Sequence, residues 1–136
     1  MITNADITIF NKIVRDRTHV FTPTVIAGVC FVHKYARSGG AAEQTDDEYI
    51  VRIPKTATIN GAPAFDKYLP ADAYRALDDP TGYWTIQKDD IILKGAGLET
   101  VEAVKASKRE FCLITEWQDD TSRGSDAVQH FRIGGT

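Results

Sequence analysis

Short apolar runs separated by turn residues recur along the whole chain. Seven of them are rich in β-branched and aromatic residues, which favour strands. They cover residues 7–14, 25–35, 49–53, 83–87, 91–94, 111–117 and 128–133. So many short strands in 136 residues predict a mainly β fold, a small β-barrel or sandwich with one or two short helices and long loops.

The last run alternates between apolar and polar positions. Phe131 and Ile133 share one face of the expected strand, whereas His130 and Arg132 share the other. We therefore expect Phe131 and Ile133 to point into the core, and His130 and Arg132 to face water or a partner.

The run 25–35 is apolar on both faces. Uninterrupted alternation places Val25, Val29 and Phe31 on one face, and Ile26, Cys30 and Val32 on the other. Either this strand is central in the sheet, or another subunit covers its second face.

Two segments predict short helices, and two others predict long connections. Residues 70–77 begin with proline, which suits the first helical position, and residues 98–107 place apolar side chains at helical spacing. The connections are 36–48 and 55–82. The second contains Asn60-Gly61, a frequent hairpin turn, and Pro63 would restrict the returning strand to a sheet edge.

Length and charge narrow the functional classes. A chain of 136 residues fits one domain spanning residues 1–136. Its formal net charge of -3 argues against a protein whose main task is to grip nucleic-acid phosphates. No apolar run approaches the roughly 18 residues of a membrane span, and the first residues do not resemble a secretory leader. We expect no membrane partner and a protein that stays in the cytoplasm where it is made.

The cysteines and histidines do not predict a metal site. Cys30 and Cys112 both lie in apolar runs, so free buried thiols are the simpler interpretation, with a disulfide as the alternative. Cys30 and His33 lie three positions apart on an expected strand, so their side chains point to opposite faces. We expect neither a metal nor a cofactor.

Candidate catalytic groups lack the surroundings that catalysis needs. Ser122 and Ser125 lie near His130 with acidic neighbours, but no nucleophile elbow surrounds either serine. Paired acids such as Asp89-Asp90 fall in expected turns, where they are usually solvated. The prediction is that the protein is not an enzyme and has no catalytic residues.

Charge is unevenly distributed along the chain. Residues 36–48 hold one arginine against four acidic residues and a Gly-Gly pair, which is typical of a flexible acidic arm. A small basic stretch contains Lys12, Arg15, Arg17 and His19. It could touch phosphate, but a salt bridge to the acidic arm of another subunit is the more economical interpretation.

Three segments together carry a resemblance to a known family. They are ITNADITIFNK at residues 2–12, YWTIQKDDIILKG at 83–95 and EWQDDTSRGSDAVQHFRIGG at 116–135. In these stretches the chain resembles a family of small virion proteins from tailed phages of Gram-positive bacteria, often described as minor capsid or head-tail connector proteins.

This resemblance implies a structural virion protein of the phage neck. Such proteins form homo-oligomeric rings, of about six or twelve copies, that close the DNA-filled head and join it to the tail. The implied partners are other copies of the chain, a portal or adaptor protein on the head side and tail proteins on the other side. DNA would pass through the channel without sequence-specific binding, and the protein would be found in virions assembled in the host cytoplasm.

In that assembly the acidic arm, or residues 55–82, would reach a neighbouring ring or close the channel. Outward groups near the end of the chain could meet the acidic arm of a neighbour. The candidate interface residues are Arg37, Glu43, Asp46, Asp47, Glu48, Arg123, His130 and Arg132.

Three other functions stay open. A tail terminator or tail completion protein is also a small β-rich ring protein. An OB-like barrel that binds single-stranded nucleic acid would expose aromatic side chains in a basic groove. A small hydrolase, the least favoured, would depend on Ser122, Ser125 and His130.

Overall fold

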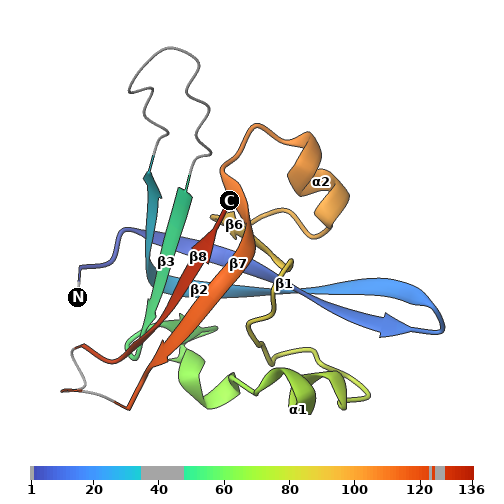
Figure 1. Ribbon diagram of the computed structural model, residues 1–136, viewed down its shortest axis with the longest axis horizontal. Helices are drawn as coiled ribbons and strands as arrows, with labels where there is room; N and C mark the ends of the chain where they lie inside the picture. Colours follow the sequence, from blue (N-terminus) through green and yellow to red (C-terminus); the bar gives the residue numbers. More distant parts are fainter. Residues whose placement is uncertain (1, 35–47, 123, 125–127) are drawn as a thin grey trace.

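The protein folds around a closed six-stranded β-barrel (Figure 1). The computed structural model describes residues 2–34, 48–122, 124 and 128–136. Neighbouring barrel strands follow the order β1–β6–β7–β8–β3–β2, and β2 pairs back with β1. Their bounds are β1 Ala5–Arg15, β2 Thr18–Lys34, β3 Glu48–Pro54, β6 Ile91–Lys94, β7 Phe111–Asp120 and β8 His130–Gly135. The prediction of a mainly β fold is confirmed, and of the two expected forms, barrel or sandwich, the protein adopts the barrel.

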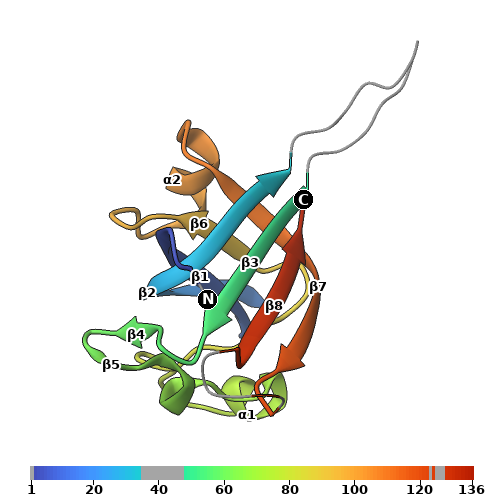
Figure 2. The same cartoon turned by 90° about the vertical axis from the view of Figure 1, so that its left-hand side faces the viewer.

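Two long strands close the barrel because each changes partner along its length. β2 pairs with β1 as far as Val29 and with β3 from Cys30 onward. β7 pairs with β6 as far as Leu113 and with β8 from Ile114. The barrel can thus be described as two sheets that share β2 and β7. The first sheet contains β1 and β6 together with β2 and β7. The second contains β3 and β8 together with β2 and β7, and Figure 2 shows β3 and β8 lying between β2 and β7.

The strand expected at 25–35 begins earlier than its pattern indicated. β1 and β2 form a long antiparallel hairpin whose turn residues, Asp16 and Arg17, both have positive φ. Pro23 lies inside β2, where β1 is the only partner that pairs with β2, so the missing N–H costs little at a free edge. The end of this hairpin extends beyond the barrel (Figure 1).

A bulge in β2 corrects the faces expected for that strand. Ala5 is paired with Val29 but Ile7 with Ile26, so β2 holds one extra residue, and Gly28 there has φ of 78°. The alternation therefore reverses at Gly28. Ile26 and Val29 both face the core, whereas Val25, expected on the same face as Val29, is 45% exposed.

The shorter elements lie between the barrel strands. They are β4 Thr58–Ile59, β5 Ala62–Pro63, the 3-10 helix η1 Ala64–Lys67, α1 Ala71–Arg75 and α2 Val101–Ala106. Asn60 and Gly61, both with positive φ, form the turn of the expected hairpin, and Pro63 lies in the edge strand β5. Both helices fall inside their predicted segments, and Thr100 caps α2 by accepting from the Ala103 N–H at 3.1 Å.

The strand predicted at 83–87 is wrong. Only Trp84 makes an isolated bridge there, to Tyr68. The Asn11 side chain instead makes the hydrogen bonds that a neighbouring strand would make with Thr85. It accepts from the Thr85 N–H at 3.1 Å and donates to the Thr85 carbonyl at 2.7 Å. The segment is apolar because it packs inside the barrel, with Trp84 and Thr85 fully buried.

Two apolar clusters stabilise the fold. The larger fills the barrel and includes Phe131 and Ile133, which confirms their inward orientation. Its aromatic part joins Trp84 and Phe131 to Tyr68 through edge and tilted contacts at 4.4–5.6 Å. The smaller packs Val101 and Val104 of α2 on the outside of the first sheet.

Candidate functional site

Three of the eight expected interface residues lie in the described part of the chain, and all three are in the second sheet. Glu48 begins β3, opposite Lys34 of β2, and His130 and Arg132 lie on β8. The remaining five lie outside the described residues: Arg37, Glu43, Asp46, Asp47 and Arg123.

The outward side of the second sheet carries a mixed set of charges. Because Val51 and Ile53 point into the core, Arg52 between them points outward, and it is paired with Arg132 on the neighbouring strand. We call this surface the charged face. Its residues are Lys34, Glu48, Arg52, Glu116, Asp120, His130 and Arg132.

Ion pairs on the charged face are loose. Arg132 Nη1 lies 3.6 Å from Glu116 Oε1, and His130 Nε2 lies 3.6 Å from Asp120 Oδ2. The Arg132–Glu116 pair is partly exposed, and pairs of that kind contribute about 0–1 kcal/mol to stability. These side chains can therefore exchange partners at low cost, as an interface requires.

A shallow pocket of about 170 Å³ lies at one end of the charged face, with Glu48 and Arg132 in its wall. Gly134 helps to create it: a Cβ at that position would lie 2.9 Å from Glu116 Cγ. The structure thus brings two of the predicted interface residues together around one hollow.

The hydrolase residues do not form a triad within the described chain. The His130 Nδ1 atom lies 2.8 Å from the Val128 carbonyl, and His130 Nε2 lies 3.6 Å from Asp120 Oδ2, with no described serine bonded to the ring. Ser122 is exposed, and Ser125 lies outside the described residues. Among the residues described, no group of three or more His, Cys, Asp or Glu side chains could hold a metal ion.

Both cysteines are free thiols, as the simpler interpretation predicted, but only Cys112 is buried, whereas Cys30 is half-buried. Burial raises the pKa of the Cys112 thiol to about 12. A thiol with that pKa holds almost no thiolate near neutral pH and is a poor nucleophile.

A buried polar network corrects the expectation that the Asp89-Asp90 pair is solvated, because Asp90 is fully buried. Asp90 accepts hydrogen bonds from Asn11 Nδ2 at 3.0 Å, Gln87 Nε2 at 2.8 Å and the Lys12 N–H at 3.3 Å. The network ties residues 85–90 to β1. One signal was present in the sequence: Asn11 is a polar residue at an inward position, between Ile9 and Ile13.

Burial raises the pKa of Asp90 above its ordinary value of 3.8, although the hydrogen bonds from Asn11 and Gln87 oppose the shift. The folded protein therefore binds more protons than the unfolded chain from pH 3.8 up to the raised pKa, and stability falls as pH rises through that window. We expect the unfolding free energy of the wild type, minus that of Asp90→Asn, to decrease with rising pH in urea titrations. A difference that grows with pH would contradict this assignment.

Comparison with known proteins gives one match. Residues 2–136 match the model of a family of unknown function, DUF6751. The chain belongs to this family. No curated protein and no solved structure matches this DUF6751 chain. In the described part of the chain, none of the helices has the length and apolar character that crossing a membrane requires.

Proposed function

We propose that this DUF6751 protein is a structural virion protein that forms a ring in the neck of a tailed phage, closing the DNA-filled head and joining it to the tail. The three segments described above support the phage assignment by resemblance. A barrel with protruding parts supports the structural role, because such a subunit can offer different surfaces to different neighbours.

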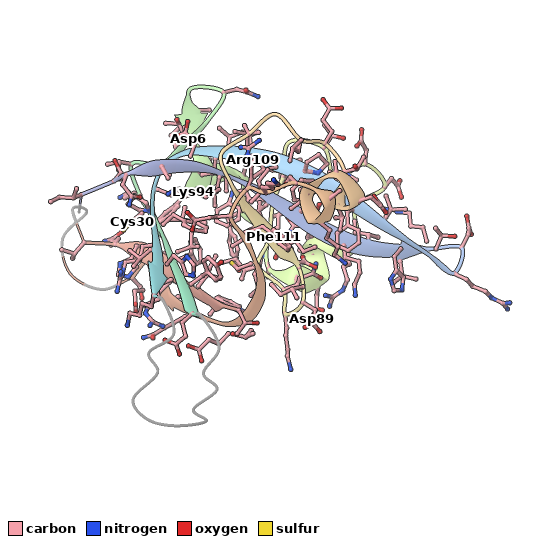
Figure 3. All side chains as sticks on the ribbon, turned by 90° about the horizontal axis from the view of Figure 1, so that it is seen from above. Asp6, Cys30, Asp89, Lys94, Arg109 and Phe111 are labelled. Carbon is pink, nitrogen blue, oxygen red and sulfur yellow. The ribbon has the colours of Figure 1, made fainter. Side chains whose placement is uncertain are left out.

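The observation that carries the proposal is the β1–β2 hairpin. Its end extends past the barrel, as Figure 3 also shows, and exposes Val14 at 57% and Val20 at 44%. Arg17 and His19 lie in the same exposed end. A ring requires a heterologous interface, in which two different surfaces meet. The hairpin end and the charged face are two such surfaces on one subunit.

Charge reversal tests the ring. We expect sedimentation velocity to show a closed oligomer for the wild type and a monomer for Arg17→Glu, since a glutamate at the hairpin end would be repelled by Glu48, Glu116 and Asp120 of the charged face. Lys105→Glu, an exposed change on α2, is the matched control and should leave the oligomer intact. Oligomers that survive both Arg17→Glu and, in a separate variant, Val14→Asp would overturn this pair of surfaces.

Imaging tests the neck role directly. Gold labelling of the protein in phage particles should place it between portal and tail, and particles lacking it should lose DNA or carry no tail. Label on free, unjoined tails, at the end of the tube that docks onto the head, would instead favour a tail terminator. Normal infectious yield without the protein would reject both roles.

A further inference from the structure

A second pocket, of about 420 Å³, lies at the end of the barrel near α1. Four separate parts of the chain form it: β1, α1, residues 86–90 and β7. Asp89, labelled in Figure 3, belongs to the third of these parts. The volume is in the range of small-molecule sites, roughly 300–1,000 Å³, but the pocket is a wide-open surface depression that would leave much of a ligand in solvent.

One wall of the pocket is an exposed tryptophan. Trp117 is 43% exposed although it follows the inward alternation of β7, opposite the buried Ile133. The Trp117 ring packs in a tilted orientation beside the Phe131 ring, with centroids 6.5 Å apart. This contact places Trp117 next to the aromatic core. An indole held in this way offers a surface on which a planar ring can stack.

Three cations line the same pocket as the tryptophan: Lys12, Arg75 and Lys88. Lys12 and Lys88 line the pocket and form no ion pair with any described acidic residue. Arg75, the third, is already held by Gln87 at 2.6 Å and Asp72 at 2.6 Å. The one acidic residue in the wall, Asp90, accepts the hydrogen bonds of the buried network and also attracts the Lys12 side chain electrostatically.

We propose that this pocket binds a nucleotide unit, with the base stacked on Trp117 and the phosphate between Lys12 and Lys88. The site goes beyond the neck role and does not depend on it. Stacking on an aromatic side chain contributes about 1–3 kcal/mol per base and tolerates any sequence. The same unit can come from a free nucleotide or from single-stranded nucleic acid.

The tryptophan favours a nucleotide over an acidic peptide. Lysine is a point charge that attracts phosphate and carboxylate alike, but only the nucleotide adds a planar base that can stack on the Trp117 indole. Here the arginine is engaged by its own neighbours, and the lysines are the available groups. The overall charge of -3 does not prevent this, because the attraction is local to the pocket.

Trp117 provides its own reporter for the test. Trp84, the only other tryptophan, is fully buried, so quenching by an added base reports Trp117. We expect dTMP and a ten-residue oligo-dT to quench the wild type, thymidine to bind more weakly than dTMP, and affinity to fall with salt. Much tighter binding of oligo-dT than of dTMP identifies a strand as the source, and equal binding identifies the free nucleotide.

Matched lysine variants locate the phosphate. Lys12→Ala and Lys88→Ala should each weaken binding about fivefold and lower the salt dependence, while Lys105→Ala on α2 should bind as the wild type does. Trp117→Leu should weaken binding of labelled oligo-dT about tenfold by anisotropy. The proposal is overturned by unchanged emission at millimolar nucleotide and oligonucleotide, by equal affinity of the lysine variants and the wild type, or by quenching with an oligoglutamate peptide only.

Discussion

Replacing Trp84 with alanine is expected to lower the unfolding free energy by about 3–5 kcal/mol, the usual cost of removing a large buried aromatic side chain. Trp84 is the largest fully buried side chain of the described residues. Its ring contacts Tyr68 and Phe131 at centroid distances of 5.0 and 5.6 Å. Its Nε1–H donates to the Ala64 carbonyl at 2.8 Å, so the alanine variant also leaves that carbonyl without its donor.

Urea unfolding followed by far-ultraviolet circular dichroism measures this loss. Trp84→Phe keeps an aromatic ring but removes the N–H donor, so it should cost about 1–3 kcal/mol and remain folded if the alanine variant does not. Val128→Ala is the control, since Val128 is 52% exposed and its truncation should change stability by about 0.5 kcal/mol or less. A Trp84→Phe variant as stable as the wild type would show that the Ala64 hydrogen bond contributes nothing.

The local pattern predicted most strands because it reports burial on one face. Phe131 and Ile133 alternate with His130 and Arg132 in the sequence. In the barrel the same alternation separates buried from outward side chains. The same rule failed at 83–87, where Trp84 and Thr85 are buried side by side but the backbone makes only one isolated bridge, from Trp84 to Tyr68. Apolar composition signals burial, but a strand also needs a neighbouring backbone to pair with.

The bulge at Gly28 shows a second limit. A single inserted residue reverses which face is buried, so a correct strand assignment still placed Val25 on the wrong side. Glycine within a strand is a general indication of such a bulge, but which side chains it turns outward depends on the pairing with β1.

Neither candidate surface could be assembled from sequence alone. The charged face joins Arg52 and Arg132 across two strands that are far apart in the chain, through a pairing that only the fold specifies. The nucleotide pocket gathers Lys12, Lys88 and Trp117 from three distant segments, so no motif links them. Asn11 is different, because a polar residue at an inward position of a strand already signals a buried hydrogen-bonding role.

Replacing Asn11 with alanine is expected to cost about 3 kcal/mol of unfolding free energy. The fully buried Asn11 side chain serves three groups: the N–H and carbonyl of Thr85, and the Asp90 carboxylate. Without it these groups stay buried and lose a partner, and each such loss costs about 1–3 kcal/mol unless water enters the gap. Urea unfolding at neutral pH measures the effect.

Asn4 provides a matched control for the role of burial. Its side chain also hydrogen-bonds to both backbone groups of one residue, donating to the Phe31 carbonyl at 3.0 Å and accepting from the Phe31 N–H at 2.8 Å. Asn4 is exposed, however, so water can replace it and Asn4→Ala should cost about 1 kcal/mol or less. Equal losses for the two variants would mean that the hydrogen bonds themselves, and not the burial of their partners, set the cost. A loss at Asn11 several times larger would identify the network between β1 and residues 85–90 as a main support of the barrel end that forms the nucleotide pocket.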